Sequence, residues 1–333
     1  MKRTVDEITG NRRMRRNRRF EWTRRMVREN HLSTADLIWP VFLCEGTGIE
    51  EPLEKLPGVK RYSVDRIGAE AKKAQALGIP AIATFANVAL EKRNETGSEV
   101  LNPDNILNQA TKAIKDAAPE IGIITDVALD LFTDHGHDGI YRNGIIHNDE
   151  TVEMLCEAAV IQARCGADIV SASEMMDGRM GAIRDALNEA GYNDIGTLAY
   201  TAKYASGYYG PYREAVGTED LLKGDKRTYF MDPANSDEAI HEAALDIAEG
   251  ADMIMVKPGM PYLDIIRRLK DEFMVPTFAY QVSGEYAMIM AAAQQGYIEE
   301  ERVIMESLLC FKRAGADGIL TYFAPRVAEI LNG

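Results

Sequence analysis

The sequence is poor in cysteine and has no long apolar run, and each absence excludes a class of protein. Its 333 residues contain four cysteines, no two of which form a CxxC pair: Cys44, Cys156, Cys165 and Cys310. This spacing encodes neither a disulfide framework nor a thiolate zinc site, so we expect a reducing compartment. No run approaches 18 apolar residues, and the arginine-rich N-terminus has no apolar signal region. We therefore expect a soluble, cytoplasmic protein with no membrane partner.

Positive charge is scarce over most of the chain. The formal net charge is −14, which disfavours nucleic acid as a partner of the molecule as a whole. Residues 1–35 are different, because they hold eleven Lys and Arg against four Asp and Glu, giving +7 and leaving −21 for residues 36–333. We interpret residues 1–35 as a basic arm that contacts a neighbouring subunit. A solvated helix and an RNA-binding tail are the alternatives.

Beyond the arm, short apolar or β-branched runs alternate with longer alanine-rich segments that carry charges at helical spacing. Eight runs have the first character: Leu37–Leu43, Ala81–Phe85, Ile121–Leu129, Asp168–Ala172, Gly196–Tyr200, Asp252–Lys257, Pro276–Val282 and Asp317–Phe323. The helical pattern occurs in seven segments: Asp65–Ala76, Asn105–Ala117, Glu150–Arg164, Met180–Ala190, Ser236–Glu249, Tyr262–Phe273 and Glu300–Arg313. This alternation predicts a parallel sheet with helices packed on it.

A short repeat favours closure of that sheet. Gly-Ala-Asp occurs at 166–168, 250–252 and 315–317, each time between a predicted helix and a predicted strand. Glycine suits the left-handed residue after a helix, and its recurrence before alternate strands favours a cyclic architecture. We predict a (β/α)8 TIM barrel with an N-terminal arm. A doubly wound open sheet is the alternative, but no predicted strand is followed by GxGxxG or a phosphate-binding loop.

Two lysines end neighbouring strands of the predicted barrel. Lys257 follows Met-Ile-Met-Val and precedes Pro258, while Lys203 follows Tyr200-Thr-Ala. Groups at the carboxyl ends of barrel strands face the active site. Burial among apolar residues would lower the pKa of Lys257, and a neutral amine attacks carbonyl groups. The pair predicts Schiff-base catalysis, with two strand-end cations that bind a carboxylate or phosphate as the alternative.

Two long connections, after the third and fifth runs, hold further candidates, and we expect lids there. In the first, Asp134-His135-Gly136-His137-Asp138 follows Asp126 and Asp130. Imidazole with carboxylate suits zinc, manganese or iron, and carboxylates alone favour magnesium. The alternative is a loop whose aspartates cap helices and whose histidines bond to backbone groups.

The second connection contains Tyr208-Tyr209-Gly-Pro-Tyr212-Arg213, followed by Lys226 and Arg227. Aromatic cover with nearby cations suits closure over an anionic small molecule, and Arg213 can bind a carboxylate with two hydrogen bonds. The alternative is an exposed loop with packed tyrosines. Arg179, after the fourth run, raises the same question and decides nothing alone.

Five motifs resemble the porphobilinogen synthase family, also called the 5-aminolevulinate dehydratases. The stretch 250–262 around Lys257 resembles the active-site signature of that family. Four other stretches agree in the same order along the chain: 175–179, 200–206, 282–286 and 318–322. The resemblance covers essentially the whole chain, including the basic arm.

The resemblance implies a lyase that condenses two molecules of 5-aminolevulinate to the pyrrole porphobilinogen, in tetrapyrrole synthesis. Lys257 would hold the first substrate as a Schiff base in the P site, and Lys203 the second in the A site. The resemblance also implies that Ser283 and Tyr322 bind the P-site carboxylate, and that Asp126 and Ser173 lie near the P-site amine. In the A site, Arg213 and Lys226 would bind the carboxylate. Tyr209 and Tyr212 would belong to the lid. A class I aldolase-type lyase is the alternative enzyme, and an RNA-associated scaffold is the non-enzymatic alternative.

The resemblance also implies a metal and an assembly. Zinc-dependent members have three cysteines where this chain has Ala128, Asp130 and Asp138, so a zinc thiolate site cannot form. The aspartates resemble the magnesium-using branch, with Asp130 and Asp138 in the active-site loop and Glu242 at a second, allosteric Mg²⁺. The family also implies homo-octamers, in exchange with hexamers, built through the arm.

Two positions depart from the family pattern. Phe230 stands where a glutamine is expected beside the A-site carboxylate, and an apolar ring cannot donate that hydrogen bond. Ser171-Ala-Ser173-Glu174 stands where Ala-Pro-Ser-Asp is expected. The second change keeps the serine and a carboxylate but loosens the turn before them.

Overall fold

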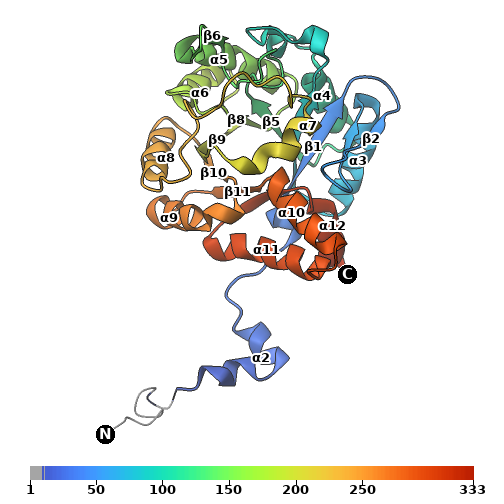
Figure 1. Cartoon of the computed structure of the whole chain (residues 1–333), viewed down its shortest axis with the longest axis vertical. Coiled ribbons are helices and arrows are strands. Elements are labelled where there is room, and N and C mark those ends of the chain that lie inside the picture. The colour runs from blue at the N-terminus through green and yellow to red at the C-terminus, as the bar shows by residue number, and fades with distance from the viewer. Residues whose placement is uncertain (1–9, 11) are drawn as a thin grey trace.

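Eight parallel strands close into a barrel in this computed structural model, which describes residues 10 and 12–333 (Figure 1). The strands are β1 (Leu37–Cys44), β4 (Ala81–Asn87), β5 (Gly122–Val127), β8 (Ile169–Ala172), β9 (Gly196–Lys203), β10 (Met253–Lys257), β11 (Thr277–Gln281) and β12 (Gly318–Thr321). Strand β12 pairs with β1, where Leu37 lies opposite Ile319, so the sheet has closed on itself. The predicted (β/α)8 barrel is confirmed, and each predicted run matches one strand to within three residues.

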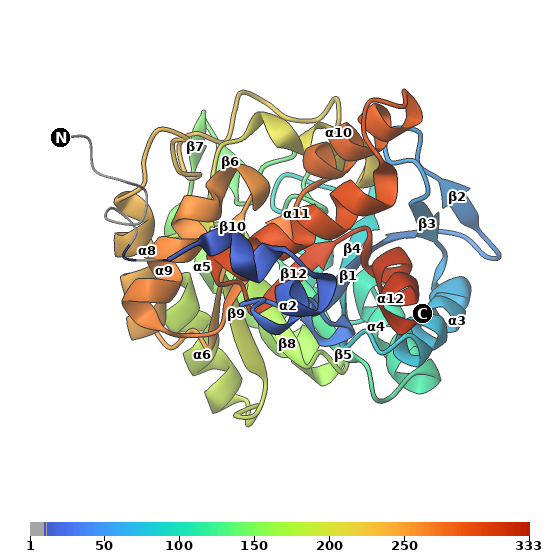
Figure 2. The ribbon, with the colours of Figure 1, turned by 90° about the horizontal axis from the view of Figure 1, so that it is seen from below.

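Helices surround the strands on the outside of the barrel (Figure 2). They are α3 (Val64–Ala76), α4 (Ile106–Ala117), α5 (Asn148–Arg164), α6 (Arg179–Glu189), α8 (Glu238–Ala248), α9 (Leu263–Phe273), α10 (Ser283–Gln294), α11 (Glu300–Ala314) and α12 (Ala324–Asn332). All seven predicted helices are present. The pattern does not predict α10 or α12, because both begin within a few residues of a strand end and α10 is apolar on every side.

Shorter elements occupy the connections. Strands β2 (Glu50–Pro52) and β3 (Lys60–Tyr62) extend the sheet beside β1. The hairpin β6 (Tyr141–Arg142) and β7 (Ile145–Ile146) lies in the connection after β5. The connection after β9 contains η5 (Gly207–Tyr209) and α7 (Gly210–Ala215). The last two connections are the ones predicted to form lids.

The Gly-Ala-Asp repeat has a structural role at all three positions. Gly166, Gly250 and Gly315 have φ of +105°, +101° and +106°, a backbone conformation that favours glycine. The aspartates accept hydrogen bonds of 2.8 Å from backbone N–H groups of the preceding strand: Asp168 from Ile123, Asp252 from Thr197 and Asp317 from Thr277. Each repeat therefore ends a helix and ties the strand it opens to its neighbour.

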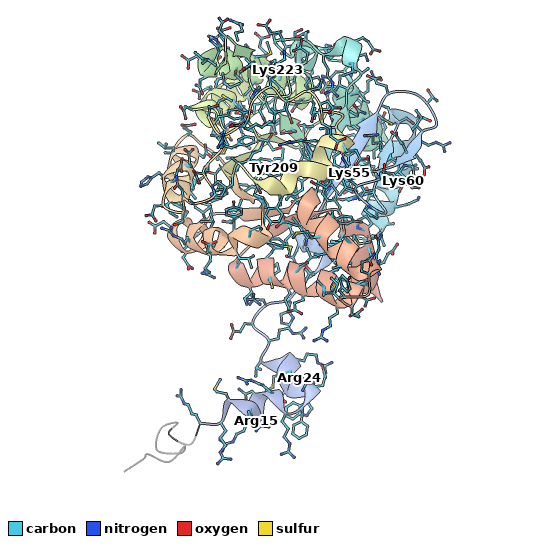
Figure 3. The ribbon with its side chains drawn as sticks, viewed as in Figure 1. Arg15, Arg24, Lys55, Lys60, Tyr209 and Lys223 are labelled. Atoms are coloured by element: carbon cyan, nitrogen blue, oxygen red, sulfur yellow. The ribbon has the colours of Figure 1, made fainter. Side chains whose placement is uncertain are left out.

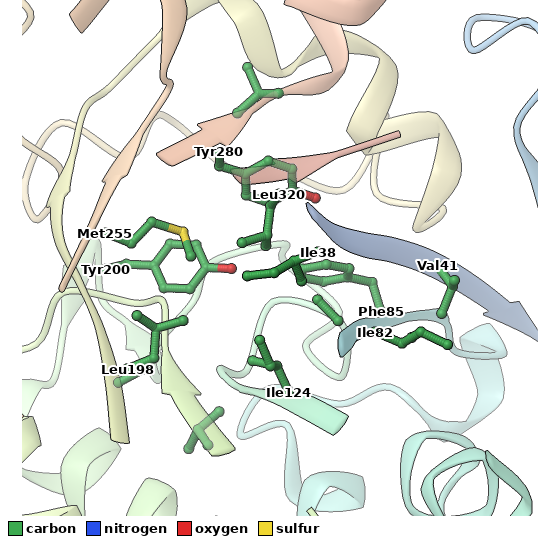
Figure 4. Packing of buried hydrophobic residues seen from close by; sticks show 14 of the residues in the cluster. Ile38, Val41, Ile82, Phe85, Ile124, Leu198, Tyr200, Met255, Tyr280 and Leu320 are labelled. Carbon is green, nitrogen blue, oxygen red and sulfur yellow. The ribbon is translucent and has the colours of Figure 1, made fainter. Parts of the chain in front are cut away.

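The inside of the barrel is filled with side chains rather than open (Figure 4). Apolar side chains from successive strands meet there, and all of them are buried: Ile38, Ile82, Ile124, Leu198, Met255 and Leu320. Tyr200 and Tyr280 join this layer with their rings. Because the interior is closed, chemistry is confined to the carboxyl ends of the strands.

The N-terminal arm projects away from the barrel as an extended segment (Figure 1). It contains η1 (Met14–Arg18) and α2 (Glu21–Met26), and neither helix has a buried residue. The rings of Phe20 and Trp22 stack 6.1 Å apart while largely exposed. Residues 1–9 and 11 of the predicted arm lie outside the described residues. Within residues 10 and 12–333, no helix has the length and apolar character needed to cross a membrane.

Candidate active site

The two predicted lysines lie opposite each other on neighbouring strands. Lys203 ends β9, Lys257 ends β10, and the register of the two strands pairs these residues. Both side chains are buried and line one cavity at the carboxyl ends of the strands. Two amino groups therefore meet in a single cavity, as Schiff-base chemistry on two substrates requires.

Most of the other predicted site residues line the same cavity. They are Asp130, Asp138, Ser173, Tyr209, Tyr212, Arg213 and Lys226. Residues that the sequence did not single out as ligands complete the lining: Gly136, Thr218, Leu222 and Phe230. Four predicted residues do not line this cavity: Asp126, Ser283, Tyr322 and Glu242.

Lys257 is surrounded by aromatic rings. Its Nζ lies 4.6 Å from the ring centroid of Tyr280, 5.2 Å from those of Tyr200 and Tyr212, and 5.5 Å from that of Tyr209. Ring faces favour a cation, but burial, followed by the charge of Lys203, lowers the pKa of Lys257 to about 7. A large fraction of Lys257 is therefore neutral amine near pH 7.

Tyr200 and Tyr280 were not predicted as neighbours of Lys257. The available signal was their place near the carboxyl ends of the two predicted strands that flank the strand of Lys257. Tyr280 is the second-to-last residue of β11, and Tyr200 lies near the end of β9. Both positions are at the rim where active-site groups gather.

Asp126 lies at the end of β5, buried near Ser173. Its Oδ1 has no hydrogen-bond partner. Burial, followed by the charge of Asp130, raises the pKa of Asp126 to about 7. A carboxyl and an amine that titrate in the same range can exchange a proton at neutral pH.

Asp138 binds two lysines at once. Nζ of Lys203 donates to Oδ1 of Asp138 at 3.0 Å, and Nζ of Lys226 donates to Oδ2. The hydroxyl of Tyr229 also donates to Oδ2, at 3.0 Å. Burial opposes ionisation, yet the two ammonium groups outweigh it and hold the pKa of Asp138 below its usual range. Lys203 also donates to the carbonyl of Ser173.

Three of the predicted metal-binding side chains in the loop after β5, those of His135, His137 and Asp138, have protein partners. Both oxygens of Asp138 are bonded to lysine, whereas His135 bonds to the carbonyl of Glu95 at 2.9 Å and His137 to that of Lys223 at 2.6 Å. Across residues 10 and 12–333, no group of three or more His, Cys, Asp or Glu could hold a metal ion. The two histidines are thus bonded to backbone groups and Asp138 to two lysines, and the assignment of Asp130 and Asp138 as metal ligands stays a prediction.

The segment Tyr208–Arg213 lies across the mouth of the barrel (Figure 3 labels Tyr209). Tyr209 donates its hydroxyl to the carbonyls of Tyr204, at 2.9 Å, and Lys257, at 3.2 Å. Ser283, at the start of α10, accepts a hydrogen bond from N–H of Tyr212 at 2.9 Å. The segment therefore covers Lys257 and is fastened both to β10 and to α10.

Two predicted ligands of the P-site carboxylate have other partners here. The hydroxyl of Ser283 is engaged with the backbone of Tyr212. The hydroxyls of Tyr322 and Tyr280 lie 3.0 Å apart, and it is Tyr280 whose ring faces Lys257. Ser283 therefore contacts the lining residue Tyr212, and Tyr322 is linked to Lys257 through the ring of Tyr280.

Nearly the whole chain is similar to proteins of one known family. A family model described as delta-aminolevulinic acid dehydratase matches residues 11–330. The chain belongs to this family. The Bradyrhizobium diazoefficiens delta-aminolevulinic acid dehydratase is 59% identical, over 96% of this chain and 90% of that protein. The Rhodobacter capsulatus protein of the same name is 51% identical, over 96% of each chain.

A solved member of the delta-aminolevulinic acid dehydratase family has the same fold. The Toxoplasma gondii enzyme, solved in complex with the reaction product porphobilinogen, superposes with a TM-score of 0.94 at 44% identity. The match covers 96% of this chain and 91% of that chain. The resemblance inferred from five motifs is confirmed.

This dehydratase family member has a second, acidic cavity beside the first. Asp177, Glu238 and Glu242 line it, and Phe230 lines both cavities. Glu242 projects from α8, and burial raises its pKa although Arg179 opposes the shift. The position predicted to bind an allosteric metal is thus separate from the lysines.

Arg179 and Glu174 form a buried cluster behind the second cavity. Nη1 of Arg179 donates to Asp246 at 2.8 Å, and its Nε lies 3.5 Å from Glu174. Burial raises the pKa of Glu174 to about 7, and neither of its carboxylate oxygens has a hydrogen-bond partner. Arg179 is therefore a structural cation, and not a substrate ligand.

Proposed function

We propose that Lys257 and Lys203 each bind one molecule of 5-aminolevulinate as a Schiff base and that this chain joins the two into porphobilinogen. Membership of the family establishes the dehydratase activity, in which two substrates combine with loss of two waters. The observation that carries the assignment of the lysines is the pairing of Lys203 with Lys257 in one cavity. Neither the aldolase nor the RNA-scaffold alternative has support from the comparisons.

Lys257 is suited to react as a free amine. Its neutral form attacks the ketone of the first substrate, and we assign the transfer of the proton to Asp126, a nearby charge that influences Lys257 and whose pKa is also about 7. The rings around Lys257 exclude water, which protects the imine from hydrolysis. Ser283 and Tyr322 would reach the substrate carboxylate once Ser283 releases the backbone of Tyr212.

The second substrate would lie on the side of Lys203. Arg213 and Lys226 are the cations that line the cavity there and can bind its carboxylate. Ser173, Tyr209 and Tyr212 line the same space. An anionic substrate would take over Lys226 from Asp138, since one ammonium group can satisfy either carboxylate.

For the metal, we propose Mg²⁺ at the acidic cavity. Glu242, Glu238 and Asp177 offer hard oxygen ligands, and Mg²⁺ bound through few carboxylates retains several waters. The ion would be held largely through water, because the described residues contain no group of three or more His, Cys, Asp or Glu close enough to bind it directly. When bound, the ion would neutralise repulsion among these carboxylates. Asp130 and Asp138 are not part of the proposal.

The arm suggests how the chain assembles, and the cysteines suggest its cellular compartment. Its charge of +7 against −21 for the body, together with its exposed rings, fits docking on a second subunit, and we propose a homo-octamer in exchange with hexamers. The four cysteines are free thiols, which fits a reducing cytoplasm.

A colorimetric assay for the pyrrole tests the function. Purified protein with 5-aminolevulinate should form porphobilinogen, and Mg²⁺ should raise the rate after chelation. Borohydride reduction with the same substrate should add mass to Lys257. Absence of pyrrole and of any adduct would contradict the function. Restoration by Zn²⁺ but not by Mg²⁺ would contradict only the metal, and loss of the Mg²⁺ response in Glu242→Gln would support its site.

A further inference from the structure

We propose that Phe230 is a positioning residue of the second substrate site, where the face of its ring and the carboxylate of Asp138 together hold the nitrogens of Lys203 and Lys226. This inference rests on the proposed function, because it assigns the ring to the second Schiff base. Nζ of Lys203 lies 4.2 Å from the ring centroid, and Nζ of Lys226 lies 5.5 Å from it. Phe230 is buried and lines the cavity between them.

The backbone fixes the ring at this place. The N–H of Met231 donates to the carbonyl of Lys203 at 3.0 Å, and the N–H of Ala205 donates to the carbonyl of Met231 at 2.8 Å. The N–H of Phe230 donates to the carbonyl of Lys226 at 2.9 Å. Phe230 is therefore bonded to the backbone of Lys226, and the next residue, Met231, to the backbone of Lys203.

The preceding residue, Tyr229, contacts the carboxylate that binds both lysines. Tyr229 donates its hydroxyl to Asp138, and its ring meets that of Phe230 edge-on, with centroids 4.7 Å apart. Consecutive side chains thus approach the lysine pair from two directions. One orients the carboxylate between the lysines, and the other turns its ring face toward both ammonium groups.

The charge balance explains why a ring is needed. Asp138 brings one negative charge to two positive charges in a buried cavity, where charges interact more strongly than in water. Asp130, whose Oδ2 lies 4.0 Å from Nζ of Lys226, contributes less charge, because burial and the charge of Asp138 raise its pKa. The negative face of an aromatic ring attracts cations, most strongly where water is excluded. Phe230 therefore supplies part of the attraction that a single carboxylate cannot. The glutamine expected here has no such face.

The ring would serve the reaction as well as the resting state. An ammonium group and a ketone form a protonated Schiff base and water, so the positive charge remains on the nitrogen of Lys203. A ring that holds this nitrogen before the step also faces the cation after it. Removing the ring should therefore slow the second Schiff base and leave the first unaffected.

Three variants test this role: Phe230→Leu keeps an apolar side chain, Phe230→Tyr keeps the ring, and Phe230→Gln restores the family residue. Phe278→Leu, which removes a ring at the start of β11, is the matched control. We expect Phe230→Leu to lower kcat/KM for 5-aminolevulinate about ten-fold, and Phe230→Tyr to change it less than about two-fold. Borohydride should trap Lys257 equally in all variants, but Lys203 less in Phe230→Leu.

Each outcome has a distinct meaning. If Phe230→Leu and Phe230→Tyr lose equal activity, or if trapping at Lys203 does not fall, the ring has only a packing role and the inference is wrong. Equal trapping at Lys257 and an unchanged melting temperature show that the variants are folded. A wild-type protein that forms no porphobilinogen overturns the proposed function, and this inference with it. If the wild-type protein forms porphobilinogen but the Phe230 variants do not behave as expected, only the role of Phe230 is wrong.

Discussion

Lys203 and Lys257 share a cavity but differ in what surrounds their nitrogens. Lys257 is surrounded by tyrosine rings, whereas Lys203 is bonded to the carboxylate of Asp138. Lys257 follows the apolar run Met-Ile-Met-Val, which predicts a lowered pKa, whereas Lys203 follows Tyr200-Thr-Ala. The sequence therefore predicts that two amines meet and that the pKa of Lys257 is lowered, while the ion pair of Lys203 with Asp138 depends on side chains brought together by folding.

The pKa of Lys257 leads to a pH-dependent rate. The neutral amine is the reactive form, so borohydride trapping of Lys257 at low substrate should rise about ten-fold between pH 6 and pH 8 and then level off. Because the charge of Lys203 contributes to the lowered pKa, Lys203→Met should move the midpoint to higher pH. A profile that is flat up to pH 9 in the unmodified protein would contradict this assignment.

Asp138 should be essential for the folded state as well as for turnover. Asp138→Asn leaves the buried ammonium group of Lys203 and the partly buried one of Lys226 without their shared carboxylate, and we expect it to lower the free energy of unfolding by about 3 kcal/mol and to abolish most activity. Chemical denaturation and the pyrrole assay measure the two effects. Asp134→Asn, an exposed change in the same loop, is the control. Equal denaturation midpoints for the two variants would refute the expectation.

The two lysine partners of Asp138 could not be predicted from the sequence of its loop. A carboxylate in a loop can bind a metal or an ammonium group, and the sequence of the loop does not distinguish them. The partners that decide it, Lys203 and Lys226, are 65 and 88 residues further along the chain. Only the closed barrel brings these three residues together.

Among the elements, α10 connects the two halves of the candidate site. Ser283 binds the backbone of the segment Tyr208–Arg213. Glu285, two residues later, accepts hydrogen bonds of 2.5 Å from the N–H groups of Met260 and Val282, and so fixes the loop that follows Lys257. The first turn of α10 thereby holds the cover and the reactive strand end in one arrangement.

Gly284 is the point where the cover lies closest to α10. A Cβ at this residue would lie 2.4 Å from the carbonyl oxygen of Tyr208, too close for any side chain. Gly284→Ala should therefore lift the segment from α10, raise KM for 5-aminolevulinate about ten-fold and increase proteolysis within residues 204–237. Gly207→Ala has no atom within 4 Å of its new Cβ and is the control. Equal KM values in both variants would disprove this contact.

The strands were predictable and two of the helices were not. Buried parallel strands are nearly continuous apolar runs, so β1, β4 and β10 are visible in the sequence. Helix α10 has no polar face that would reveal a helical period, and its first residues have the character of an active-site motif. The residues 282–286 were therefore interpreted as an active-site motif, and the helix α10 that they begin was not predicted.

At the scale of the whole molecule, the exposed rings of the arm have no packing partner within the described barrel of the same chain. No residue of η1 or α2 is buried, and Trp22 is 57% exposed on a segment that has left the barrel (Figure 1). Arg15 and Arg24 project from the same segment (Figure 3). A basic segment with exposed rings gains most by covering an acidic surface of another subunit.

One substitution tests that assembly while leaving the barrel intact. Trp22→Glu places a negative charge where we expect the arm to contact an acidic body, so the protein should dissociate from octamers into smaller species, measured by analytical ultracentrifugation. Tyr297→Glu, a change at a ring 80% exposed on the barrel, should leave the octamer unchanged. High salt should weaken the arm contact in the unmodified protein, because screening reduces attraction between +7 and −21. If Trp22→Glu sediments like the unmodified protein at every concentration, the arm does not build the assembly, and the exposed rings need another explanation.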